Sequence, residues 1–301
     1  MYSPVMNWIR WCGLVLSCLG GTAHGITIQD TSSAGYLTGS GAYTGVARIL
    51  GTFNTGVQFN CTGALVAPTV VITAGHCVAS ATQWDVNFET ASGIATIGVS
   101  GSSLHPLYAS RTSSPNLPQF DVALLQLGMP APLDAAVYTL SDGSLPLTFG
   151  DLTGSVVDQV GYGLGGNPSG ALGVGVRRRA QNRVAGIAAG EPDQPLVTLH
   201  NFSASGEPGN FGLVAAGDSG GPMFFSNDDF KNVIIGIASA SSIPAVASGT
   251  YTTGSYFGLH TNVFEPLTRS WLTTAMINTP EPGSALLLVS GITLLALLRR
   301  R

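Results

Sequence analysis

The segment Gly217-Asp-Ser-Gly-Gly-Pro222 sets one hydroxyl, that of Ser219, among residues that permit a tight, open backbone. Glycine reaches backbone conformations that other residues avoid, so N–H groups can converge on a point beside that hydroxyl. Convergent donors of this kind stabilise an oxyanion during acyl transfer. A plain glycine-rich turn would not need an acid and a proline at these positions. The segment therefore predicts a nucleophilic serine.

A serine hydroxyl needs a neighbouring base, because it is a weak nucleophile at its own pKa. Among five histidines, His76 stands at the end of a β-branched run, directly after the small residues Ala74 and Gly75. Small residues let a ring pack closely against the backbone at the end of a strand. Taken alone, such a histidine is more often structural than catalytic. With a nucleophilic serine elsewhere in the chain, it becomes the candidate base.

The segment Phe120-Asp-Val-Ala-Leu-Leu-Gln-Leu127 opens an almost wholly apolar strand with a carboxylate, Asp121. Burying a carboxylate is costly unless a donor pairs with it, and a histidine N–H would serve. The alternative is an acid at a strand edge that binds loop amides. Asp121 is thus the candidate partner of the base.

Together and in chain order, these three segments resemble the motifs of the chymotrypsin/trypsin-like serine peptidases. The resemblance covers roughly residues 26–276. The matching strings are Ala74-Gly-His-Cys77, His105-Pro-Leu-Tyr108, Asp121-Val-Ala-Leu-Leu, the segment 217–222, Gly236-Ile-Ala-Ser239 and Trp271-Leu272. The resemblance implies an all-β fold of two packed six-stranded antiparallel β-barrels with a C-terminal helix. The site would lie in the cleft between the barrels.

The resemblance also implies a role for each residue. His76 would take the proton of Ser219 and later return it to the leaving amine, while Asp121 holds the histidine tautomer. The backbone N–H groups of Gly217 and Ser219 would bind the oxyanion. No cofactor and no metal are implied. An esterase with a G-x-S-x-G elbow would show the order Ser, Asp, His, which this chain reverses.

These roles predict a secreted serine endopeptidase that acts on proteins or peptides. The alternative is a catalytically weak protein of the same fold that serves at a surface or in a matrix. Four residues are implied to contact substrate: Leu213, Ser239, Ser241 and Gly258. Leu213 stands where trypsin has an aspartate, so a buried Lys or Arg of the substrate would have no counter-charge. We therefore expect cleavage after apolar residues.

Cys61 and Cys77 stand where the family bridges the histidine loop to a neighbouring strand. A bridge that closes 15 intervening residues stabilises by about 3 kcal/mol in the chain-entropy model. It also fits an oxidising compartment. The alternative is a metal site of both cysteines with His76, which lacks further ligands. Trypsin-like members usually carry more disulfides, but no cysteine follows Cys77.

In the resembling family, a freshly cut N-terminus pairs with the acid just before the nucleophile, here Asp218. The small residues Ala23 and Gly25 precede Ile26, an apolar, β-branched start of the required kind. Signal peptidase itself would then create the activating terminus, whose ammonium offsets the cost of burying the carboxylate. The alternative is that Ile26 begins an edge strand and Asp218 pairs elsewhere.

Both ends of the chain carry targeting patterns. Residues 1–25 combine Arg10, a short apolar run and small residues, which is typical of a secretory signal peptide. Residues 279–301 join Pro-Glu-Pro, an uncharged run that makes a short transmembrane helix, and three terminal arginines. This order resembles the PEP-CTERM sorting signals of Gram-negative bacteria, which an exosortase-type enzyme is thought to process. It implies a destination in the cell envelope or extracellular matrix; a plain C-terminal anchor is the alternative.

Residues 26–278 make up the expected peptidase domain, with one barrel at about 26–140, a second at about 141–264 and a helix at about 265–276. Short β-rich runs between turn residues indicate a barrel or sandwich. These runs are 46–50, 61–66, 70–73, 94–99, 122–127, 156–161, 196–199, 223–225 and 233–237. Leu267, Trp271, Leu272 and Ala275 recur at helical spacing and should face the core.

Composition agrees with an exported globular domain. Charged residues are 9% of the 301, against about 25% in ordinary soluble domains, and apolar residues at 45% suffice for a sizeable core. The formal net charge is −4, and the chain has one lysine, Lys231. A nucleic-acid binder that relies on clustered cations is therefore excluded.

Overall fold

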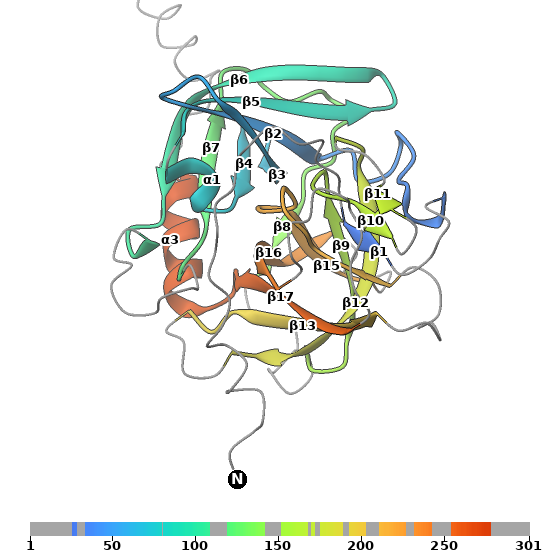
Figure 1. Ribbon diagram of the computed structural model, residues 1–301. Helices are drawn as coiled ribbons and strands as arrows, with labels where there is room; N and C mark the ends of the chain where they lie inside the picture. The colour runs from blue at the N-terminus through green and yellow to red at the C-terminus, as the bar shows by residue number, and fades with distance from the viewer. Residues whose placement is uncertain are drawn as a thin grey trace, which may run out of the picture.

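The computed structural model describes residues 26–28, 34–79, 81–108, 119–141, 152–167, 170–171, 175–188, 193–202, 211–226, 232–242 and 254–277 (Figure 1). The expected signal peptide at 1–25 and the sorting tail at 279–301 lie outside these residues. Among the described residues, no helix is both long and apolar enough to cross a membrane.

The first barrel closes in the strand order β2-β3-β4-β7-β6-β5, with every neighbouring pair antiparallel. The strands are β2 (Val46–Phe53), β3 (Gln58–Ala67), β4 (Val70–Thr73), β5 (Ala81–Thr90), β6 (Gly93–Leu104) and β7 (Ala123–Leu127). Alternating aliphatic residues from these strands fill the interior, with Ile49, Leu65, Val86 and Leu125 almost fully buried. The one-turn helix α1 (His76–Ala79) follows β4 after Ala74 and Gly75.

The second barrel is a ring of six antiparallel strands in the order β15-β9-β12-β13-β17-β16, closed by the pairing of β15 with β16. The strands are β9 (Val156–Gly161), β12 (Arg178–Ile187), β13 (Leu196–Phe202), β15 (Pro222–Phe225), β16 (Val233–Ser241) and β17 (Gly254–Asn262). A short strand, β8 (Thr139–Leu140), adds to β16 in parallel. The two barrels confirm the fold expected from the sequence.

A small sheet flanks the second barrel in the order β11-β10-β1-β14. Its strands are β1 (Thr27–Ile28), β10 (Gly166–Asn167), β11 (Gly170–Ala171) and β14 (Gly212–Leu213), and the 3-10 helix η3 (Ala34–Tyr36) follows β1. Ile26 and Ile28 are fully buried beside Tyr36 and Ala180. The start of the described chain is therefore fixed next to the segment that leads to Ser219.

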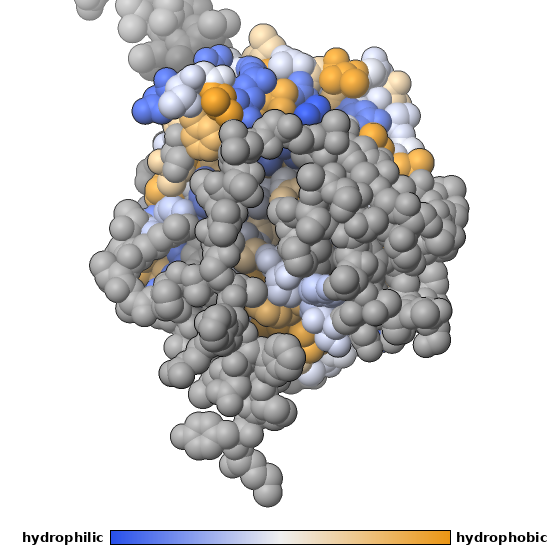
Figure 2. Space-filling view, in the orientation of Figure 1, coloured by the Kyte–Doolittle hydropathy of each residue, from blue (hydrophilic) through white to orange (hydrophobic). Residues whose placement is uncertain are grey.

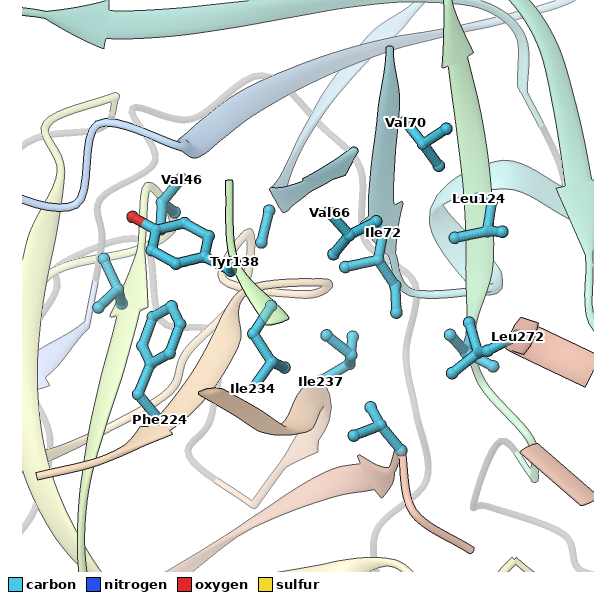
Figure 3. Packing of buried hydrophobic residues seen from close by; sticks show 14 of the residues in the cluster. Val46, Val66, Val70, Ile72, Leu124, Tyr138, Phe224, Ile234, Ile237 and Leu272 are labelled. Atoms are coloured by element: carbon cyan, nitrogen blue, oxygen red, sulfur yellow. The ribbon is translucent and has the colours of Figure 1, made fainter. Parts of the chain in front are cut away.

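An apolar cluster joins the two barrels. Figure 3 shows Ile72 and Leu124 of the first barrel on one side and Phe224, Ile234 and Ile237 of the second on the other. All five are buried, so separating the barrels would expose this apolar surface to water. This cluster fixes how the two barrels, and the residues they carry, face each other.

The C-terminal helix α3 (Pro266–Ile277) packs Leu272 into the same cluster, where Trp271 and Ala275 are partly buried. A side-chain oxygen of Glu265 accepts the N–H of Thr268 at 2.8 Å and caps the first turn. One core expectation was wrong: Leu267 is 53% exposed, and Thr268, one position later, is buried instead. The described surface over β5 and β6 mixes hydrophilic and hydrophobic residues (Figure 2).

Candidate active site

Asp121 and His76 meet at the ends of two adjacent strands of the first barrel. Strand β4 pairs with β7, and His76 follows the former while Asp121 precedes the latter. One carboxylate oxygen, Oδ2, lies 2.7 Å from Nδ1 of His76, and the other accepts the backbone N–H of His76 at 2.8 Å. The bidentate contact fixes both the ring and its backbone.

Asp121 and His76 differ in burial, and their contact determines which ring nitrogen of His76 carries the proton. Its side chain is fully buried, whereas that of His76 is 31% exposed. Because a carboxylate oxygen only accepts, Nδ1 of the neutral ring carries the proton and Nε2 carries the lone pair. The ring therefore offers its basic nitrogen away from Asp121.

Two residues of the second barrel also hold Asp121, and sequence analysis missed both contacts. The hydroxyl of Ser239 donates to Oδ2 at 2.6 Å, and the hydroxyl of Thr261 donates to the backbone carbonyl at 3.0 Å. Ser239 was expected only as a substrate contact. The sequence could have predicted further donors, because a carboxylate at the start of an apolar strand needs more than one hydrogen bond when it is buried.

The loop that carries Ser219 lies between the barrels. Gly217 and Gly220 have φ angles of +89° and +85°, which favour glycine. A Cβ at Gly220 would collide with Thr73 and the carbonyl of Thr62, so only glycine fits there. The backbone N–H of Thr62 donates to the carbonyl of Ser219 at 2.8 Å. The glycines expected from the motif thus permit close contact with the first barrel.

Hydrogen bonds also set the orientation of the peptides before Ser219. The carbonyl of Ala216 accepts the N–H of Leu164 at 2.5 Å, which turns the N–H of Gly217 the opposite way. The carbonyl of Gly217 accepts side-chain donors from Thr62 at 3.1 Å and Asn60 at 3.3 Å. Both side chains belong to β3, and neither was expected from the sequence.

Asp218, which precedes Ser219 in this loop, is fully buried. Its Oδ1 accepts the N–H of Gly163 at 2.8 Å, and its Oδ2 accepts those of Ala215 at 2.9 Å and Ile26 at 3.0 Å. Burial raises the pKa of Asp218 to about 6, and the three N–H donors act against that rise. The structure thus brings Ile26 and Asp218 together, and Ile26 also has a strained φ of +28°.

The expected pocket residues lie on adjacent segments. A Cβ at Gly258 would lie 2.9 Å from the hydroxyl oxygen of Thr198, 3.1 Å from Val214 and 3.2 Å from Leu213, so these side chains pack directly against this glycine. Gly258 is also the register partner of Ser241 across β16 and β17. Leu213 itself is fully buried. Three of the four expected residues therefore meet, and the fourth, Ser239, is on the same strand as Ser241.

A disulfide joins Cys61 of β3 to Cys77 of α1, with the Cα atoms 6.3 Å apart, as expected. The two sulfurs also lie within 4.8 Å of a ring nitrogen of His76. Because the sulfurs are bonded to each other, they are not thiolate ligands, and the metal alternative loses its donors. The bridge secures the helix on which His76 lies.

A family model described as Trypsin matches residues 36–262. The chain belongs to the trypsin family. No curated protein matches it by sequence. Among solved structures, HL collagenase has a TM-score of 0.59 and 18% identity, over 80% of this chain and 96% of its own. Human heparin binding protein has a TM-score of 0.56 and 21% identity, over 82% and 96%.

At these identities, the solved structures show a shared fold. Membership of the trypsin family supports a serine protease hydrolase at the level of the family.

Proposed function

We propose that the protein is a serine endopeptidase that works through an acyl-enzyme. Nε2 of His76 takes the proton of Ser219 as the hydroxyl oxygen attacks the scissile carbonyl carbon. The C–N bond then breaks, and His76 returns the proton to the leaving amine. Water repeats the sequence to release the acid. Asp121 stabilises the imidazolium, and the N–H groups of Gly217 and Ser219 stabilise the oxyanion.

The observation that carries this proposal is the fixed His76–Asp121 pair beside the Ser219 loop, where the carbonyl oxygen of Ser219 lies 3.7 Å from Sγ of Cys77, the residue after His76. Asp121 sets the tautomer that a base needs, through its 2.7 Å contact with Nδ1. Thr62 of β3 donates a hydrogen bond to the carbonyl of Gly217, and the N–H of Gly163 binds the side chain of Asp218, the next residue. A histidine with a purely structural role would need neither the contact that fixes its tautomer nor the hydrogen bonds that fix the Ser219 loop.

We also propose cleavage after apolar residues. Leu213 stands where trypsin has an aspartate and packs against Gly258, so no acid at this position would pair with a basic side chain of the substrate. Profiling on a mixed peptide library tests this preference. Dominant cleavage after Arg or Lys would refute it.

The proposed place of action is outside the cytoplasm. The signal-peptide pattern at 1–25 and the Cys61–Cys77 disulfide both suit an oxidising compartment. The pattern at 279–301 supports exosortase-type sorting to a bacterial envelope or matrix, with membrane contact before processing. Deleting 280–301 should give an active enzyme that is no longer retained, and a truncated protein that fails to fold would contradict this.

Signal peptidase is the proposed source of the mature terminus at Ile26. The ammonium formed there would replace the N–H that now lies 3.0 Å from Asp218. Cleavage would also remove the strained φ of Ile26, because that angle needs a preceding residue. N-terminal sequencing of the secreted protein tests the position of the cut.

A second candidate is a trypsin-fold binding protein, which the similarity to human heparin binding protein brings into consideration. Heparin is a polyanion, and binding it needs clustered cations. This chain has eight basic and fifteen acidic residues between positions 26 and 279. That charge disfavours a polyanion as its ligand.

The decisive experiment is labelling of the secreted protein by a fluorophosphonate, with Ser219→Ala as the matched control. Labelling of the wild type and none of the variant supports the peptidase. A folded wild type that neither takes the label nor cleaves the peptide library would contradict it and favour the binding protein.

A further inference from the structure

A buried arginine lies on the same side of the second barrel as Asp218. Arg178 of β12 is 2% exposed and stands opposite Gly161 of β9. Side chains directly opposite in an antiparallel pair lie on the same face of the sheet. A Cβ at Gly161 would collide with Oδ1 of Asp218. Arg178 therefore projects from the face that Asp218 covers.

Both side chains are buried, and each charge favours the ionised form of the other. Burial raises the pKa of Asp218; the N–H groups of Ala215, Gly163 and Ile26 oppose that rise, and attraction to Arg178 adds to their effect. Burial lowers the pKa of Arg178, and attraction to Asp218 works against that change as well. Removing one of two opposite buried charges leaves the other with less compensation.

The contact between Asp218 and the start of the chain does not by itself need a free terminus. It is a hydrogen bond from the backbone N–H of Ile26, and β1 is held in its sheet by Thr27 opposite Leu213. An arginine remains charged at every pH at which the protein would work. The cation at Arg178 is therefore present before and after any cut at Ile26.

We propose that Arg178 is a positioning residue for the loop that carries Ser219. Its permanent charge keeps Asp218 ionised and in place whether or not Ile26 bears an ammonium group. Release of that terminus then tunes activity and does not switch it on. This inference rests on the proposed peptidase function, because the loop matters for chemistry only if Ser219 is the nucleophile.

The test crosses two changes in the full chain. One is an alanine inserted between Gly25 and Ile26, with the mature terminus checked by mass spectrometry; the other is Arg178→Met. We expect the inserted form to keep kcat within about 10-fold of the wild type while Arg178 is present. Combining the insertion with Arg178→Met should lower kcat by at least about 100-fold more. Arg178→Lys, which keeps a charge, should restore part of that loss.

Arg179→Met is the matched control, because Arg179 is the next residue of β12 and pairs with Asp158 at 2.8 Å. It should change kcat little in either form. An inserted form that is inactive with Arg178 intact overturns the proposal, whether or not the Met variant folds. The proposal is also overturned if the inserted form has the same kcat with Arg178 as with Met at that position.

A readout of stability separates this inference from the peptidase proposal. The groups that face Asp218 are Arg178 of β12 and the N–H donors of Ile26, Gly163 and Ala215. Without Arg178, Asp218 takes up a proton more easily in the folded protein. The Tm lost in Arg178→Met should therefore be largest near pH 8 and shrink towards pH 5. A constant loss overturns the coupling even if no peptidase activity is found.

Discussion

The two barrels share a strand order but differ in what they bury. In the first barrel, the buried polar residues on the described strands are all threonines: Thr62, Thr73 and Thr90. The described strands of the second barrel bury an acid, amides, a histidine and an arginine, among them Asp158, Gln159, Arg178, Asn182, His260 and Asn262.

This difference indicates that the two barrels respond differently to pH. A threonine hydroxyl can satisfy itself locally, as Thr73 does on the carbonyl of Thr62 at 2.7 Å, so the described strands of the first barrel bury no charge that needs a partner. Buried charges need partners in place. The second barrel, which carries Ser219 and Asp218, should therefore be the half that responds to pH and to the state of the N-terminus.

The largest expected effect tests whether peptide hydrolysis needs a residue from each barrel. Ser219→Ala and His76→Ala should each lower kcat/KM by about 10⁴-fold or more, and the double variant should lose little beyond the larger single loss. Steady-state hydrolysis of a peptide ester or amide measures this. Additive losses would mean that the two residues do not act as a unit.

The next effect concerns the disulfide of the first barrel. Replacing Cys61 and Cys77 together by serine should lower the free energy of unfolding by about 3 kcal/mol. Urea unfolding of the oxidised wild type and the double variant gives the value. A loss near zero would show that the first barrel does not depend on its bridge.

A pH effect should appear in the second barrel. His260 is fully buried, and burial lowers its pKa to about 3. Below pH 6.5 the unfolded chain binds a proton that the folded chain refuses, so stability falls by up to about 1.4 kcal/mol per pH unit. His260→Phe should flatten that slope between pH 6.5 and 5, as unfolding curves at several pH values would reveal. An unchanged slope would place the acid sensitivity elsewhere.

The smallest effect tests a bond between the barrels. Asn60→Ala removes one of two side-chain donors to the carbonyl of Gly217 and should lower kcat about 10-fold, with KM little changed. Asn87→Ala is the control, because Asn87 lies on β5 and accepts from Thr96. A KM effect without a kcat effect would show that Asn60 serves substrate binding and not the oxyanion.

The sequence predicted most of the first barrel and less of the second. β4 and β9 have the expected bounds, because their β-branched runs end at clear turn residues. β5, β12 and β17 were not expected, since Ala81–Thr90 and Arg178–Ile187 are rich in polar residues and Gly254–Asn262 begins with small polar ones. Their strands form because neighbours in the barrels pair with them, which a local pattern does not show.

The candidate site followed the same rule. Ser219, His76 and Asp121 stand in short strings with a chemical signature, so they could be named from sequence. Asn60, Thr62 and Arg178 could not, because their roles depend on register across strands and on a partner far along the chain. Leu267 was misplaced because helical spacing alone does not tell which of two adjacent stripes faces the core.

Each barrel holds the other's half of the site. Ser239 of the second barrel binds Asp121, and Asn60 and Thr62 of the first barrel bind Gly217. A rotation of one barrel against the other would break both sets of bonds at once. In the proposed peptidase, the rate of hydrolysis would then report directly on how the barrels dock. On gentle heating or in dilute urea, activity should vanish in the step that loosens the interface, while each barrel still keeps its own strands.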